Sequence, residues 1–145
     1  MPVLTRWTIR TAMIYLIAGL AAGVLYWANV QWQIAPIFGA FSPTYLHMLV
    51  IGWLTQLIFG VIYWMFPIIR KDNMRGDPRL AWAVYGLLNV GLLVRVVCEP
   101  WRGLDPNDVN GIGLVVAAVL QVAAGYLFIV VCWPRVRERA GTGTA

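Results

Sequence analysis

Four apolar stretches dominate this 145-residue chain, and each is close to the length of a helix that crosses a membrane. A spanning α-helix needs about 20 mostly apolar residues. The stretches cover residues 11–28, 46–69, 80–98 and 111–133. Each is bounded by charge, Pro or Gly, and none shows the alternation of a barrel strand. The sequence therefore predicts an all-α integral membrane four-helix bundle that forms one domain.

The composition excludes several other classes of protein. Hydrophobic residues make up 61% of the chain and charged residues 12%, whereas a soluble domain has about 25% charged residues. This excess excludes a disordered chain, and two cysteines cannot staple a small secreted domain. The net charge is +5, but the basic residues flank the apolar stretches instead of forming one patch. We therefore expect a lipid bilayer, and no nucleic acid, around this chain.

The basic residues also predict an orientation. Nine of the eleven lie before the first stretch, between the second and third, or after the fourth: Arg6, Arg10, Arg70, Lys71, Arg75, Arg79, Arg135, Arg137 and Arg139. Short loops rich in Lys and Arg stay in the cytoplasm. We expect both termini to be cytoplasmic in the cell's inner membrane, residues 134–145 to form a cytoplasmic tail, and the first stretch to be retained instead of cleaved as a signal.

The second stretch has two different faces if it is a regular helix of about 100° per residue. One face carries His47, Ile51, Leu54, Ile58, Val61 and Met65. The opposite face carries Gly52, Gln56, Gly60 and Tyr63. Small residues allow helices to approach closely in a membrane, and an amide can hydrogen-bond across the contact. We therefore predict that the glycine face packs against another helix.

His47, the single histidine, is the main candidate for a functional residue. Ionisable groups inside a membrane are costly and are functional candidates by default. An imidazole above the aliphatic side chains of Ile51 and Leu54 suits an axial ligand to a flat, hydrophobic heme. We predict that His47 ligates the iron of a b-type heme and that Ile51 and Leu54 contact its ring. The alternative is that His47 is hydrated or bonded to a neighbouring residue.

The pattern around His47 resembles one helix of a known family. It consists of His47, Gly52-Trp53, Phe59-Gly60, Tyr63-Trp64 and Pro67. This pattern resembles a ligand-bearing helix in the catalytic subunit of heme-copper oxygen and nitric oxide reductases, especially the C-type branch. That helix begins with His-x-His, whose second member ligates the low-spin heme and whose first ligates the high-spin heme. Counted from the Gly-Trp pair, His47 matches the second member, and Tyr45 occupies the first position.

The resemblance covers residues 45–67 and departs from the family elsewhere. The family's three copper-binding histidines and its second low-spin heme histidine cannot all be present in a chain with one histidine. Oxygen or nitric oxide reduction by this chain alone is therefore not expected. The resemblance implies a short, four-helix relative of the cytochrome c oxidase subunit I superfamily. Such a relative would use one heme in respiratory electron transport or in heme handling.

Heme with two axial ligands needs a second donor. A homodimer through the second stretch would supply it, because a two-fold axis would present two His47 side chains at one depth. Met48, Met13, an open position or a ligand from another subunit are the alternatives.

Arg95 and Arg102 are the predicted partners of the heme propionates, since both belong to the end of the bundle that holds His47. The alternative for Arg95 is a local ion pair with Glu99, four residues later.

A different class of function remains open from the sequence. A cofactor-free bundle that packs against subunits of a respiratory complex, or assists their assembly, has the same four apolar stretches. The colour of the purified protein distinguishes the two hypotheses, because bound heme absorbs visible light and its spectrum changes on reduction.

Overall fold

The structure, a computed structural model, describes residues 1–66 and 77–136. Its spanning helices are α1 (Val3–Trp32), the continuous α3–η1–α4 (Ser42–Met65), α5 (Pro78–Leu104) and α6 (Asp108–Cys132). All four are long and apolar enough to cross a membrane, and the described residues contain no strand. This confirms the predicted all-α four-helix bundle. The chain is a multi-pass membrane protein.

All four spans begin before their predicted first residue, and α1 and α5 also continue past their predicted last one. α1 has 30 residues and includes Arg6 and Arg10, and α5 continues past Cys98 through Glu99 and Pro100 to Leu104. The prediction counted only apolar residues. Polar residues also continue a helix, because its backbone hydrogen bonds are local and long basic side chains can extend to the interface.

Several predicted features lie outside the described residues. These are the last part of the second stretch (67–69), most of the tail (137–145), and the basic residues Arg70, Lys71, Arg75, Arg137 and Arg139.

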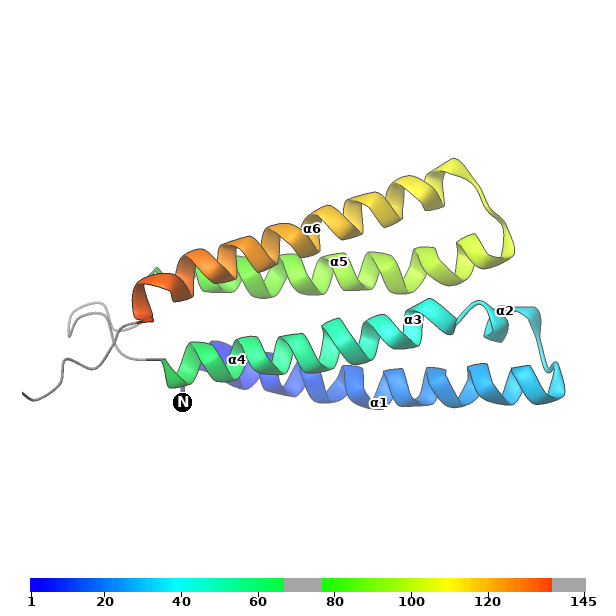
Figure 1. Cartoon of the computed structure of the whole chain (residues 1–145), viewed down its shortest axis with the longest axis horizontal. Coiled ribbons are helices and arrows are strands. Elements are labelled where there is room, and N and C mark those ends of the chain that lie inside the picture. The colour runs from blue at the N-terminus through cyan, green and yellow to red at the C-terminus, as the bar shows by residue number, and fades with distance from the viewer. Residues whose placement is uncertain (67–76, 137–145) are drawn as a thin grey trace, which may run out of the picture.

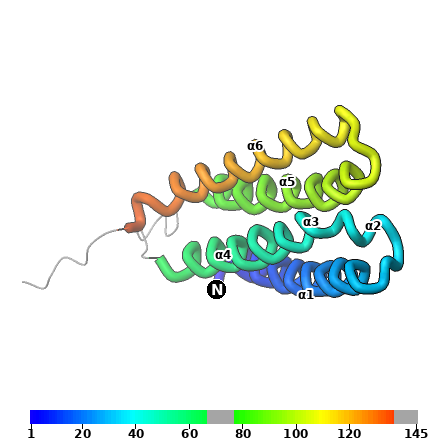
Figure 2. Tube along the Cα trace, turned by 45° about the vertical axis from the view of Figure 1, so that its right-hand side comes forward, coloured from blue at the N-terminus to red at the C-terminus, as the bar shows by residue number. Residues whose placement is uncertain are grey.

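The helices form two antiparallel hairpins (Figure 1). α1 packs along α3, η1 and α4, while α5 packs along α6, and the same pairing is visible from a second direction in Figure 2. At the N-terminal end of the bundle, α1 and α5 begin and α4 and α6 end. At the opposite end, here called the His47 end, α2 (Pro36–Gly39) connects the first two spans.

The predicted packing face of the second span is confirmed. Gly52, Gln56, Gly60 and Tyr63 are all buried. A Cβ atom added at Gly52 would lie 2.6 Å from Tyr15 Cγ and 2.7 Å from Leu92 Cδ2. Only glycine fits at this contact, so Gly52 sets how closely the span approaches both α1 and α5.

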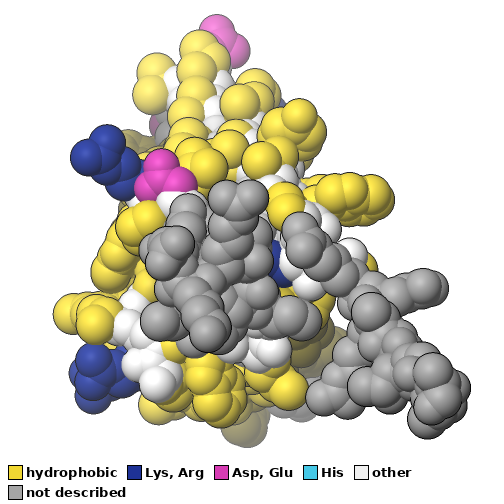
Figure 3. Space-filling view, turned by 90° about the vertical axis from the view of Figure 1, so that its left-hand side faces the viewer, with side chains coloured by type: hydrophobic (Ala, Val, Ile, Leu, Met, Phe, Trp, Pro, Cys, Tyr) yellow, Lys and Arg dark blue, Asp and Glu magenta, His cyan; other side chains and the backbone are white. Residues whose placement is uncertain are grey.

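The outer flanks of the helices are apolar. Leu54, Ile58 and Met65 of the second span are exposed, as are many aliphatic residues of α1 and α6. Figure 3 looks onto the N-terminal end, where apolar side chains cover the flanks and Lys or Arg side chains lie at the rim. This arrangement suits a bundle with lipid around its sides and water at its ends.

The second span contains a π-helical segment, η1 (Met48–Thr55). π-Helix has i→i+5 hydrogen bonds and therefore more residues per turn than α-helix. The side chain of Thr55 follows the same spacing, since its hydroxyl donates to the carbonyl of Val50 at 2.8 Å. The helix upstream of η1 is consequently rotated relative to the helix downstream.

Candidate functional site

Three ionisable side chains meet at the His47 end of the bundle. Glu99 Oε1 lies 2.8 Å from His47 Nδ1 and 3.0 Å from Arg95 Nη1. The exposed fraction of the side chain is 5% for Glu99, 16% for Arg95 and 31% for His47. A buried carboxylate therefore joins an imidazole on one hairpin to a guanidinium on the other. We call these three residues the His47 cluster.

Two local features build the cluster. Arg95 and Glu99 are four residues apart on α5, a spacing that places their side chains on one face of an α-helix. His47 is the last residue of α3 (Ser42–His47), directly before η1. The wider turns of η1 bring His47 towards α5, on the side where Gly52 and Gln56 pack.

The predicted face of His47 is therefore wrong. In a regular α-helix, His47 would share a face with Ile51, Leu54 and Ile58, because residues four apart are separated by only about 40° around the helix axis. The wider turns of η1 change this register. The exposed face therefore consists of Leu46, Val50, Leu54 and Ile58. His47 lies beside that face and contacts Glu99.

The charges of the cluster are matched in sign. Arg95 donates a hydrogen bond to Glu99, and this ion pair balances the buried carboxylate. The His47 contact is close, but Nδ1 lacks a hydrogen bond of good angle. Glu99 Oε2 and Arg95 Nε also lack hydrogen-bond partners among the described residues.

The imidazole is arranged as a single metal ligand would be. Histidines that bind metals usually direct their second ring nitrogen at a carboxylate, carbonyl or water. Here Nδ1 faces Glu99, which leaves Nε2 as the nitrogen available to a metal. The described part of the chain holds no group of three His, Cys, Asp or Glu residues suited to a metal ion. One imidazole is sufficient for an axial bond to heme iron, so the residues fit this group.

The two predicted propionate partners are held locally. Arg95 forms the ion pair with Glu99, which was the alternative for this residue. Arg102 Nη1 donates to the carbonyl of Asn107 at 3.2 Å, and a Cβ added at Gly111 would lie 2.8 Å from the same nitrogen. Arg102 is exposed, so its remaining donors face the surroundings of the bundle.

The predicted ring contacts have different positions. Ile51 is half-buried, whereas Leu54 is exposed on the outer flank. Met48, one of the proposed second ligands, packs with its Cβ against Gly19 of α1, and Met13 is exposed on α1.

Two polar residues beyond the predicted apolar stretches are buried in the structure. Glu99 directly follows the third stretch, yet it is buried inside α5. The signals that identify it are the Arg95 spacing and its position at the end of an apolar stretch. Arg135 was assigned to an exposed tail, yet it is 1% exposed. Its Nη2 donates to the carbonyls of Tyr63 at 2.9 Å and Phe66 at 2.7 Å, where α4 ends.

Comparisons of the chain with protein-family models, with curated proteins and with solved structures found no match. The resemblance of residues 45–67 to a reductase helix therefore stays a prediction. What supports a function is the geometry of the His47 cluster.

Proposed function

We propose that this membrane protein binds heme through Nε2 of His47 and serves electron transfer or heme handling. The observation that carries this proposal is the contact of 2.8 Å between His47 Nδ1 and the buried carboxylate of Glu99. This contact orients the imidazole and directs its other nitrogen away from the carboxylate. A lone imidazole in an apolar bundle has few other reasons to be held in this way.

Each residue of the cluster has a separate task in this proposal. Glu99 accepts a hydrogen bond from Nδ1–H after a small rotation of the ring, and so fixes the tautomer in which Nε2 carries the lone pair. Arg95 pairs with Glu99 and holds its carboxylate in place. When bound, heme would supply an iron that exchanges one electron. Arg102, exposed at the same end, is the basic residue best placed for an anionic propionate.

The positive-inside rule places His47 on the outer side of the inner membrane in this proposal. Arg6, Arg10 and Arg79 lie in the first turns of α1 and α5 at the N-terminal end, which we assign to the cytoplasm. Both termini would then be cytoplasmic. Labelling of a single cysteine at Asp105 or at Asp77 tests this, after Cys98 and Cys132 are replaced by Ser. Asp105→Cys should react from outside, Asp77→Cys should react from inside, and the reverse pattern would overturn the orientation.

A homodimer remains our proposal for the second ligand, with a heme between two copies of the second span. Ile58, on the outer face of that span, is 44% exposed and open to a second copy. Ile58→Glu should split such a dimer and release its heme. One heme per two chains, measured in detergent, is the expected stoichiometry. A monomer with one heme would exclude the dimer and leave the role of His47 intact.

A pyridine hemochrome assay on the purified protein tests heme binding and heme type together. We expect a b-type spectrum for the wild type and loss of heme in His47→Ala. Leu49→Ala, which changes a nearby residue on the α1 side, is the matched control and should keep its heme. Undiminished heme in His47→Ala would remove His47 from the site. A wild type that stays heme-free after growth with added heme would contradict the proposal and favour the accessory-subunit hypothesis.

A further inference from the structure

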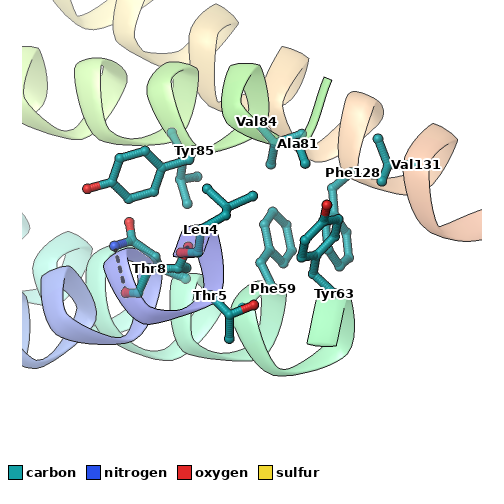
Figure 4. Close-up of a pocket in the computed structure, with 13 residues that line it drawn as sticks. Leu4, Thr5, Thr8, Phe59, Tyr63, Ala81, Val84, Tyr85, Phe128 and Val131 are labelled. Atoms are coloured by element: carbon teal, nitrogen blue, oxygen red, sulfur yellow. Dashed lines mark hydrogen bonds between the residues drawn. The ribbon is translucent and has the colours of Figure 1, made fainter. Parts of the chain in front are cut away.

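A second polar region lies at the N-terminal end, where all four spans surround a small cavity (Figure 4). Its volume is about 30 Å³. Most of the residues around it are apolar, including Leu4, Val84, Phe128 and Val131. Thr5 and Gln56 also line the cavity, and both are fully buried. We call this space the Thr5 cavity.

Gln56 presents an unpaired acceptor to this cavity. Its Nε2 donates to the carbonyl of Thr8 at 3.2 Å, the bond drawn as a dashed line in Figure 4. A carbonyl accepts only from a donor, so this bond fixes which end of the amide is nitrogen. Oε1 is therefore the other end, and it has no hydrogen-bond partner within the described residues.

Thr5 presents an unpaired hydroxyl to the same cavity. Its Oγ1 is buried without a hydrogen-bond partner in the described part of the chain. Thr8, one turn later on α1, differs because its hydroxyl donates to the carbonyl of Leu4 at 2.9 Å. Two polar atoms from different helices, α1 and α4, thus share one cavity without bonding each other. Buried polar groups of this kind are nearly always satisfied by protein or by ordered water.

We propose that the Thr5 cavity binds water, which bonds Thr5 Oγ1 and Gln56 Oε1. A buried water needs about 10–15 Å³ of such space, so the cavity has room for about two. Water donates a hydrogen to Gln56 Oε1, and it donates to or accepts from the Thr5 hydroxyl.

Water fits this cavity better than an apolar molecule does. A hydrocarbon chain would leave both Thr5 Oγ1 and Gln56 Oε1 without partners in a low-dielectric interior, which is costly. The cavity is also far smaller than the clefts of about 300–1,000 Å³ that hold drug-sized ligands. The inference is independent of heme binding, because the residues of the cavity belong to the opposite end of the bundle from His47.

Radiolytic footprinting of the full chain in detergent micelles tests the proposal, because hydroxyl radicals formed from trapped water oxidise the side chains beside it. Tyr63 lines the cavity and Tyr15 is outside its lining, and each is 8% exposed. We expect Tyr63 to be oxidised several-fold faster than Tyr15. In the double variant Thr5→Val, Gln56→Met the Tyr63 rate should fall to that of Tyr15. Equal rates in the wild type, or an unchanged Tyr63 rate in the folded variant, would overturn the proposal.

A thermal unfolding measurement gives a second test, because the unfolding midpoint should change in opposite directions for a wet and a dry cavity. If water bonds Thr5 Oγ1, Thr5→Val removes that bond and lowers the unfolding midpoint. If the cavity is dry, the same change removes an unpaired hydroxyl and raises the midpoint. Thr8→Val, which removes only a bond within α1, is the matched control. A Thr5→Val midpoint above that of the wild type would refute the water site.

Discussion

The two ends of the bundle bury polar groups in different ways. At the His47 end, three ionisable side chains contact one another directly, and the acidic member is almost fully buried. At the N-terminal end, neutral side chains line the Thr5 cavity, and the buried cation there, Arg135, donates to backbone carbonyls. Charge therefore meets opposite charge at one end, whereas at the other the described contacts of Arg135 include backbone carbonyls and the rings of Tyr63 and Phe66.

This difference predicts how each end responds to substitution. Removing one member of a buried ion pair leaves the other charge without compensation, which costs more than the pair itself contributes. Removing a donor from a backbone carbonyl leaves only a neutral acceptor, which costs less. The His47 cluster should thus behave as a unit, whereas the polar groups of the N-terminal end should contribute one at a time.

The largest expected effect is that of Glu99→Ala. This change leaves Arg95 inside the bundle without its partner, and we expect a loss of about 2–3 kcal/mol in unfolding free energy. The loss stays below that of a fully buried pair, because Arg95 keeps 16% of its side chain exposed. Equilibrium unfolding in mixed micelles measures it.

The double variant Arg95→Met, Glu99→Leu is the control for this prediction. It removes both charges and should recover most of the lost stability, because apolar residues replace a balanced pair at little cost. If the double variant is as unstable as Glu99→Ala, the cluster is not a charge-coupled unit, and the contrast between the two ends fails.

A smaller effect is expected at Gly52, which lies between the two ends. In Gly52→Ala the new methyl group would overlap Tyr15 and Leu92, so the second span must shift against α1 and α5. Overpacking of this kind costs about 1–3 kcal/mol.

Gly86→Ala is the matched control, because a Cβ there meets nothing within 4 Å. It should stabilise the helix by about 0.5–1 kcal/mol. Thermal unfolding of both variants measures the difference, and equal midpoints would show that the contact at Gly52 is loose.

The smallest of these effects is expected for Arg135→Lys. Lysine keeps the charge but lacks the planar guanidinium that reaches the carbonyls of both Tyr63 and Phe66. We expect a loss of about 1 kcal/mol, close to that of one hydrogen bond. A loss as large as that of Glu99→Ala would contradict the difference between the two ends.

The fold was predictable because its signals are local. Apolar stretches of spanning length predict helices in any membrane, whatever their partners. The packing face at Gly52, Gln56 and Gly60 was also predictable, since small residues at regular spacing mark a helix contact. Of the cluster, the ion pair between Arg95 and Glu99 was recognised as an alternative from its spacing alone.

The remaining parts of the site depend on tertiary structure. The contact of His47 with Glu99 requires the extra residue of η1, for which the sequence carries no local signal. Burial of Glu99 requires α5 to continue through Pro100, although an apolar count ends the helix at Cys98. Burial of Arg135 requires the ends of α4 and α6 to meet, a contact between residues about 70 positions apart.

The π-helical segment η1 lets the middle of the second span hold one residue more than an α-helix of the same rotation would. Its wider turns allow His47 to meet Glu99 while Gln56 faces Thr8. Deleting a single residue within Met48–Thr55 would let the segment wind as α-helix and leave both halves of the span close to their present faces. A deletion within Gln56–Met65 would instead swing the end of the span by about 100°. The second span can therefore lose a residue in its middle more easily than near its end.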